Sequence, residues 1–166
     1  MKRVVADTGP VLHLHEARAL HLFPSIGEIL VPEMVATELR SFSATLPPKW
    51  AATRTLSLSS KGRADEWQRA GLLHGGEAEA LALAIELKSD WFLSDDAAAR
   101  LMAESFGIEV HGSIGIVLWA AVNKIVGEQE AKSVLADLEN SSLWMSRKVR
   151  SEARLALDRV FKSSTP

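Results

Sequence analysis

Five acidic side chains come from four separate stretches of this chain, each after a short apolar segment or within a helix-forming stretch. Carboxylates that converge in one cleft repel one another and raise one another's pKa. A divalent cation removes this repulsion, and Mg²⁺ and Mn²⁺ prefer oxygen ligands. Such an ion activates water and stabilises charge on oxygen, so the pattern indicates a metal site for phosphoryl chemistry. The five acids are Asp7, Glu38, Glu77, Asp95 and Asp96.

Each acid, taken alone, also has an ordinary structural explanation. Asp95 or Asp96 can cap the helix that follows them, and Glu77 can complement a helix N-terminus. Glu38 can be an exposed helix residue, and an Asx-turn with the next two residues can satisfy Asp7. The metal hypothesis therefore rests on the positions of all five acids within one topology.

The elements that must position these acids are short apolar strands that alternate with helices. This alternation predicts an α/β domain with a parallel sheet covered on both faces. In open parallel sheets, binding sites lie beyond the carboxyl ends of the strands, which is where Asp7, Asp95 and Asp96 are expected. Strands are expected at residues 4–6, 28–31, 91–93 and 108–110, with an edge strand at 53–58.

The helix signals lie between these strands. Thr8 is expected to cap a helix with Pro10 at its first position, and apolar faces continue as far as Pro24. A second helix is expected from Pro32 to about Leu39. Further helices are expected at residues 63–70, 77–87, 97–105, 114–126, 128–139 and 146–161.

Length and composition limit the classes of protein to which the chain can belong. The 166 residues show no linker or repeat, so we expect one domain over 1–166, with the helices of 127–161 packed on it. A net charge of −2 and a pI of about 6.2 lack the footprint of a dedicated nucleic-acid binder. The absence of cysteine excludes disulfide and thiolate chemistry and fits the cytoplasmic location that we expect. We expect no signal peptide and no membrane span.

Four motifs carry a resemblance to a known family. In chain order they are ADTGP, VPEMVATELR, GGEAEALALA and FLSDDAAARLMAESFGIEVHGSIGIVLWA. This ordered set resembles the PIN-domain superfamily of metal-dependent ribonucleases, and within it the small prokaryotic branch that includes VapC-type toxins. The likeness covers roughly residues 1–126, and the last two helices are compatible with it. It implies a three-layer α/β/α sandwich with a short, mostly parallel sheet, and a cluster of acids that binds Mg²⁺ or Mn²⁺.

The resemblance assigns the acids one by one. Asp7 matches the first acid of the family, and Glu38 matches the second, on the helix after the second strand. Glu77 takes the third place, which many members fill with Asp, and Asp95 and Asp96 compete for the fourth. Thr8 and Ser94 match hydroxyl positions that often support the metal site.

The chain also departs from the family's pattern. A glutamate at the third position is one methylene longer than aspartate, and Glu79 is a rival for that place. The doubled Asp leaves the fourth ligand open, and the irregular stretch 41–74 is longer than in compact toxins.

Other chemistry-bearing residues have weaker signals. His13 and His15, two positions apart, do not share a helix face, so we expect surface or partial-core roles rather than zinc ligation. We expect Arg100 to pair with Asp96, and Trp50 and Trp144 to be exposed at an interface. The last helix is basic; a solvated face is the ordinary interpretation, and an RNA backbone contact is the sharper one, with steep salt dependence. Its basic residues are Arg147, Lys148, Arg150, Arg154, Arg159 and Lys162.

These observations predict a metal-dependent endoribonuclease that hydrolyses RNA phosphodiesters with a carboxylate-bound Mg²⁺ or Mn²⁺ ion. The resemblance further implies the toxin of a type II toxin–antitoxin pair, with an antitoxin protein as partner and a homodimer as the assembly. The alternative is a catalytically silent PIN-like module that binds nucleic acid or regulates, which the glutamate at the third position and the doubled Asp favour.

Overall fold

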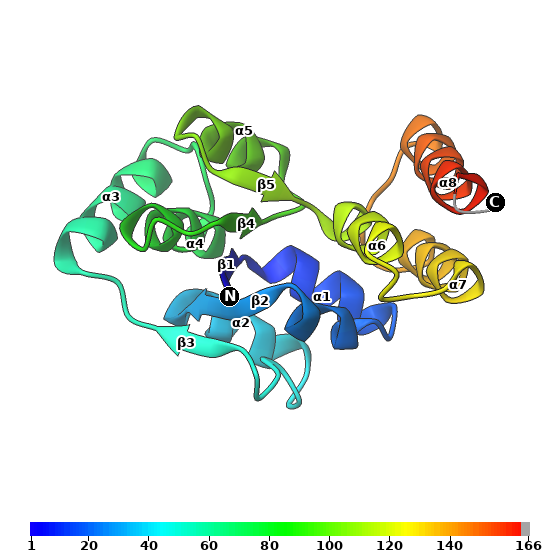
Figure 1. Cartoon of the computed structure of the whole chain (residues 1–166). Helices are drawn as coiled ribbons and strands as arrows, with labels where there is room; N and C mark the ends of the chain where they lie inside the picture. Colours follow the sequence, from blue (N-terminus) through cyan, green and yellow to red (C-terminus); the bar gives the residue numbers. More distant parts are fainter. Residues whose placement is uncertain (164–166) are drawn as a thin grey trace.

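A computed structural model describes residues 1–163 of the chain. Five parallel strands form one sheet in the order β3-β2-β1-β4-β5, flanked by helices (Figure 1). The expected α/β fold with a parallel central sheet is confirmed. The strands are β1 Lys2–Ala6, β2 Gly27–Pro32, β3 Ala52–Arg54, β4 Trp91–Leu93 and β5 Glu109–His111.

Eight α-helices and one 3₁₀ helix, η1, connect and cover the strands in residues 1–163. They are α1 Thr8–Glu16, η1 Leu20–Ser25, α2 Glu33–Phe42, α3 Leu58–Arg69, α4 Gly75–Glu86, α5 Ala97–Ser105, α6 Ser113–Val122, α7 Glu128–Glu139 and α8 Arg147–Lys162.

The central strands and helix α4 form the core. Val4, Val5 and Ala6 of β1 are fully buried, as are Phe92 and Leu93 of β4. Continuous apolar runs of this kind are typical of strands covered on both faces. Helix α4 contacts β1, β2 and β4, which explains why its alanine- and leucine-rich sequence is almost wholly buried. Because β1 and β4 are neighbours, the residues that follow them meet at one edge of the sheet.

The last three helices lie beyond the carboxyl end of the sheet (Figure 1). Helix α7 packs against α6 and α1, and α8 packs against α6 and α7. Within the described chain, no helix has the length and apolar character needed to cross a bilayer.

The first helix differs from the sequence expectation. Asp7, not Thr8, is the N-cap, because its carboxylate accepts the Gly9 N–H. The helix ends at Glu16 instead of continuing to Pro24, since Arg18 adopts a left-handed conformation at φ 56°. The chain then continues as η1, which contains Pro24.

The segment after β2 also differs. The edge strand is only three residues long, and the alternating pattern of 53–58 ends in a helix cap. The Ser57 side chain accepts a hydrogen bond from Ser60 N–H, so α3 begins at Leu58, earlier than the expected residue 63.

Candidate metal centre

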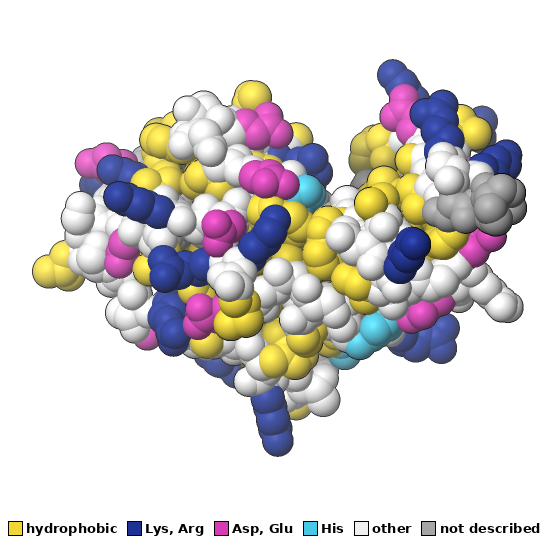
Figure 2. Space-filling view, viewed as in Figure 1, with side chains coloured by type: hydrophobic (Ala, Val, Ile, Leu, Met, Phe, Trp, Pro, Cys, Tyr) yellow, Lys and Arg dark blue, Asp and Glu magenta, His cyan; other side chains and the backbone are white. Residues whose placement is uncertain are grey.

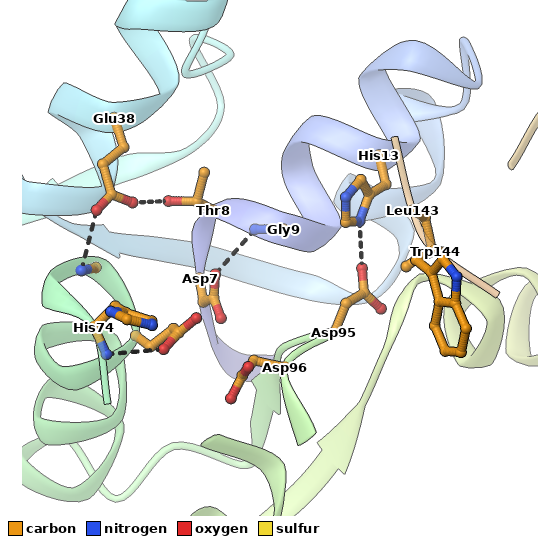
Figure 3. A pocket seen from close by; sticks show the side chains of 12 residues that line it. Asp7, Thr8, Gly9, His13, Glu38, His74, Asp95, Asp96, Leu143 and Trp144 are labelled. Carbon is orange, nitrogen blue, oxygen red and sulfur yellow. Dashed lines mark hydrogen bonds and ion pairs between the residues drawn. The ribbon is translucent and has the colours of Figure 1, made fainter. Parts of the chain in front are cut away.

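A cavity of about 380 Å³ lies at the carboxyl ends of β1 and β4 (Figure 3). It brings together all five acids that the sequence singled out, from four separate segments of the chain. Among the described residues, its lining holds no lysine or arginine. The lining consists of Asp7, Thr8, Gly9, His13, Glu38, His74, Gly76, Glu77, Asp95, Asp96, Leu143 and Trp144.

Asp7 is the most deeply placed acid, with a side chain only 4% exposed. Its Oδ1 accepts the Gly9 N–H at 2.9 Å, and its Oδ2 accepts the Ser94 hydroxyl at 2.6 Å. Burial raises the pKa of Asp7 to about 7; the hydrogen bonds from Ser94 and Gly9 oppose the rise, and the charges of Glu77 and Asp95 add to it. Asp7 is therefore a buried acid with acidic neighbours and two neutral donors.

Glu38 connects three helices at the cavity. The Thr8 hydroxyl of α1 donates to its Oε2, and the Gly76 N–H of α4 donates to its Oε1 at 3.1 Å (Figure 3). A Cβ at position 76 would lie 2.7 Å from Glu38 Oε1, so this close approach requires glycine. Thr8 thus holds the Glu38 carboxylate, and Ser94 holds that of Asp7.

Glu77 faces the cavity and its rival Glu79 does not. Glu77 Oε2 accepts the His74 N–H at 3.0 Å, in the role of a helix N-terminal acid. Glu79 is buried elsewhere, with its Oε1 3.0 Å from Lys61 Nζ. Residues two apart on a helix point in different directions, so only one of the two can line the cavity.

Asp95 and Asp96 have different surroundings. Asp96 caps α5 through a 2.8 Å hydrogen bond from Ala99 N–H to Oδ1, and its Oδ2 has no hydrogen-bond partner in residues 1–163. Both oxygens of Asp95 accept from Ser113, Oδ1 from the N–H at 2.7 Å and Oδ2 from the hydroxyl at 2.5 Å. Asp95 Oδ2 also lies 2.7 Å from His13 Nδ1.

His13 and Ser113 are site residues that the sequence reasoning missed. His13 was expected at the surface or in the partial core, but it lines the cavity beside Asp95. The sequence does place His13 four residues after Gly9, and residues four apart share one face of a helix, so His13 faces the same side of α1 as Gly9. Ser113 opens α6, and only the fold brings it to Asp95.

The expected ion pair between Arg100 and Asp96 is wrong. None of the ion pairs in the described part of the chain involves Arg100. Its Nη1 instead lies 2.7 Å from where a Cβ on Gly112 would stand, and Asp95 Oδ1 lies at the same distance from that point. Asp96 Oδ1 accepts the Ala99 N–H of α5, and the Arg100 guanidinium lies near Gly112, the residue between β5 and α6.

The donor set fits a hard divalent cation by its chemistry. Five carboxylates offer oxygen atoms, Asp7 is buried beside other acids, and the described lining holds no lysine or arginine. The described side chains, as arranged, include no group of three or more acids or histidines close enough for one ion. Both carboxylate oxygens of Asp7, Glu38 and Asp95 instead accept hydrogen bonds from the protein.

A protein-family model matches most of the chain. The DUF3368 model, described as a PIN domain, matches residues 3–158. No curated protein matches the chain. The matched region contains all five acids and most of α8, and so extends past the residues that carried the resemblance in the sequence. The chain belongs to the PIN-domain family DUF3368.

Proposed function

We propose that this chain is a Mg²⁺- or Mn²⁺-dependent endoribonuclease. The observation that carries the proposal is the cavity itself, where acids from three other segments lie around a buried Asp7 without a lysine or arginine in the described lining. PIN domains are generally nucleases, and family membership supports the same class of reaction.

We assign the metal to Asp7, Glu77 and Asp96. Glu77 is the acid whose charge acts most strongly on Asp7, and Asp96 keeps one carboxylate oxygen without a protein donor. Glu38 and Asp95 complete the site as oriented acids: Thr8 and Gly76 hold the Glu38 carboxylate, and Ser113 holds that of Asp95. A bound divalent cation would supply an activated water and stabilise charge on the phosphate oxygens.

The remaining residues orient these groups. Ser94 and Gly9 donate to Asp7 and favour its ionised form, which is the form that binds cations. Thr8 fixes Glu38 toward the cavity, and Asp95 holds the His13 ring at the cavity wall. His13 and His74 line the same cavity as the acids.

The test is cleavage of a single-stranded RNA by the purified chain. We expect cleavage with Mg²⁺ or Mn²⁺, none with EDTA, and a loss of at least about a hundredfold in Asp7→Asn. Asp137→Asn is the matched control, because Asp137 lies on α7, outside the cavity lining, and forms an ion pair with the exposed Arg18. Equal cleavage by wild type and Asp7→Asn would exclude the assignment.

A catalytically silent nucleic-acid-binding module is the second candidate. The observation in its favour is that Asp96 and Glu77 also serve as helix-terminal residues, which explains their positions without a metal. A ligand that binds only the folded state raises stability by mass action. An unchanged melting temperature in millimolar Mn²⁺ would support this candidate over the ribonuclease.

We further propose that the enzyme is the toxin of a type II pair and acts as a homodimer in the cytoplasm. The acidic cavity is suited to an antitoxin segment that places an arginine against the carboxylates. Expression of the chain alone should stop growth, Asp7→Asn should relieve this, and the product of an adjacent reading frame should co-purify. Growth that wild type and Asp7→Asn arrest equally would contradict the toxin role.

A further inference from the structure

An exposed tryptophan stands at the rim of the acidic cavity. Trp144 lies on the loop between α7 and α8 and lines the cavity with Leu143 (Figure 3). Its side chain is 84% exposed. A tryptophan carries a large apolar surface that is normally removed from water. Here the ring is left open to solvent beside the acids.

The loop that displays Trp144 is anchored on both sides. Ser142 donates its N–H to Glu16 of α1 at 2.7 Å, and its hydroxyl donates to the same carboxylate at 2.9 Å. Met145 is buried, and Ser146 caps α8. The backbone that carries Trp144 is therefore held at the cavity mouth.

A basic helix begins three residues after Trp144. Helix α8 carries six basic and two acidic side chains, although the whole chain has a net charge of −2. Arg154 pairs with a glutamate of α7, but Arg147, Arg150 and Arg159 have no carboxylate within 4 Å in the described chain. Figure 2 shows lysine and arginine gathered over α8, across a hollow from the part of the molecule that carries α5.

The acidic cavity and the basic helix α8 are together complementary to one kind of ligand. The acids of the cavity attract a cation but repel a phosphate backbone, so a polyanionic substrate needs a separate cationic surface next to them. Arg147 and Arg150 lie on the first turns of α8, three and six residues after Trp144, which itself lines the cavity that holds the acids. Aromatic rings beside basic residues bind single-stranded nucleic acid, with bases stacked on the rings.

We propose that a single-stranded RNA segment stacks an unpaired base on Trp144 and lays its phosphates against Arg147 and Arg150 as it enters the cavity. This inference rests on the proposed ribonuclease function and specifies the form of its substrate. A base within a duplex is already stacked on its neighbours and does not offer its face to the ring. Trp144 therefore selects unpaired segments over helical RNA.

Binding to a labelled RNA, followed by fluorescence anisotropy in Mg²⁺, tests the stacking contact. All variants carry Asp7→Asn so that the RNA stays intact, and the probes are an unstructured single strand and the same strand paired with its complement. Trp144→Ala should weaken single-strand binding about tenfold, and Trp144→Phe should retain it within about threefold. Phe106→Ala is the matched control, because Phe106 is an exposed aromatic residue of the segment after α5 and does not line the cavity.

The basic contact has its own readout in the salt dependence of binding. Each phosphate contact to a single strand contributes about 0.7 to the slope of log K against log salt concentration. The double variant Arg147→Gln/Arg150→Gln should lower this slope by about 1.4. The control Lys49→Gln/Arg63→Gln removes two exposed cations away from the cavity and should leave the slope unchanged.

The results separate this inference from the proposed function. Trp144→Ala binding as tightly as Phe106→Ala, or equal binding of duplex and single strand, would overturn the inference even if wild type cleaves RNA. Unchanged RNA affinity with an altered molar mass by light scattering would assign Trp144 to a protein interface and also overturn it. A wild type that cleaves no RNA refutes the ribonuclease, and the Trp144 binding data still decide the stacking contact.

Discussion

Asp7 combines two properties that oppose each other in a metal-free protein. Its carboxylate is buried and, within residues 1–163, hydrogen-bonded only to Ser94 and Gly9, yet Glu77 and Asp95 lie close enough to raise its pKa. Burial of a charge without a counter-charge costs stability. A residue that weakens the fold at neutral pH is consistent with a role in binding a cation.

The raised pKa of Asp7 predicts a specific pH dependence of stability. The pKa is about 7 in the folded chain and near 3.8 when unfolded, so protonated Asp7 contributes stability that is complete below pH 3.8 and is lost as the pH rises through 7. In EDTA, the free energy of unfolding of Asp7→Asn should exceed that of wild type at pH 8 by up to about 4 kcal/mol, and the excess should shrink toward pH 4. Urea denaturation at pH 5 and pH 8 measures this difference. An excess that does not change with pH would contradict the burial account.

Gly76 permits the close approach of Glu38. Gly76→Ala would place a Cβ 2.7 Å from Glu38 Oε1, so the carboxylate must move and Mn²⁺ affinity should fall about tenfold or more. Gly75→Ala is the control, because the nearest atom to its Cβ would be Gln68 Oε1 at 3.5 Å. Both substitutions favour the helix, so neither should lower the melting temperature by much. Equal losses of Mn²⁺ affinity would refute the steric explanation.

At the scale of elements, the acids of the cavity also bind the N-terminal ends of three helices. Asp7 caps α1, Asp96 caps α5, and Asp95 accepts the first N–H of α6. Helix N-termini carry partial positive charge, which helps a cluster of acids remain ionised at one edge of the sheet. The same side chains therefore accept hydrogen bonds from the first turns of these helices and supply the acids of the cavity.

Substitution at Asp96 separates the cap from the charge. Asp96→Asn keeps an oxygen for the Ala99 N–H and should leave stability almost unchanged while abolishing metal-dependent cleavage. Asp96→Ala should lose the activity and also about 1 kcal/mol of stability. Denaturant midpoints and cleavage rates of the two variants give the answer. Full activity in Asp96→Asn would confine Asp96 to the capping role.

At the scale of the whole molecule, the sequence predicts the strands and the location of the site better than it predicts which side chains contact one another. Apolar triplets such as Val4–Ala6 and Trp91–Leu93 predict buried parallel strands, and the acids after them predict one edge of the sheet as the site. The break at Arg18 has no sequence signal, because a non-glycine residue there adopts a left-handed conformation. The choice between Glu77 and Glu79 depends on how α4 is rotated against the sheet, which tertiary packing decides.

The contact between His13 and Asp95 is a second example of an interaction that the sequence alone does not predict. The two residues are 82 positions apart, and no local pattern links them. Only the parallel arrangement of β1 and β4 brings the start of α1 to the start of α5. Local propensity therefore places each acid on its element, while the partners of each acid follow from the topology.

Direct measurement of Mn²⁺ binding tests the central claim, that the acids of this cavity form a divalent-metal site. Calorimetric titration at pH 8 should show saturable binding by wild type, with Asp7→Asn and Asp96→Asn weakened at least about tenfold and Asp137→Asn unchanged. Binding that is absent in wild type, or equal in wild type and Asp7→Asn, would contradict the account.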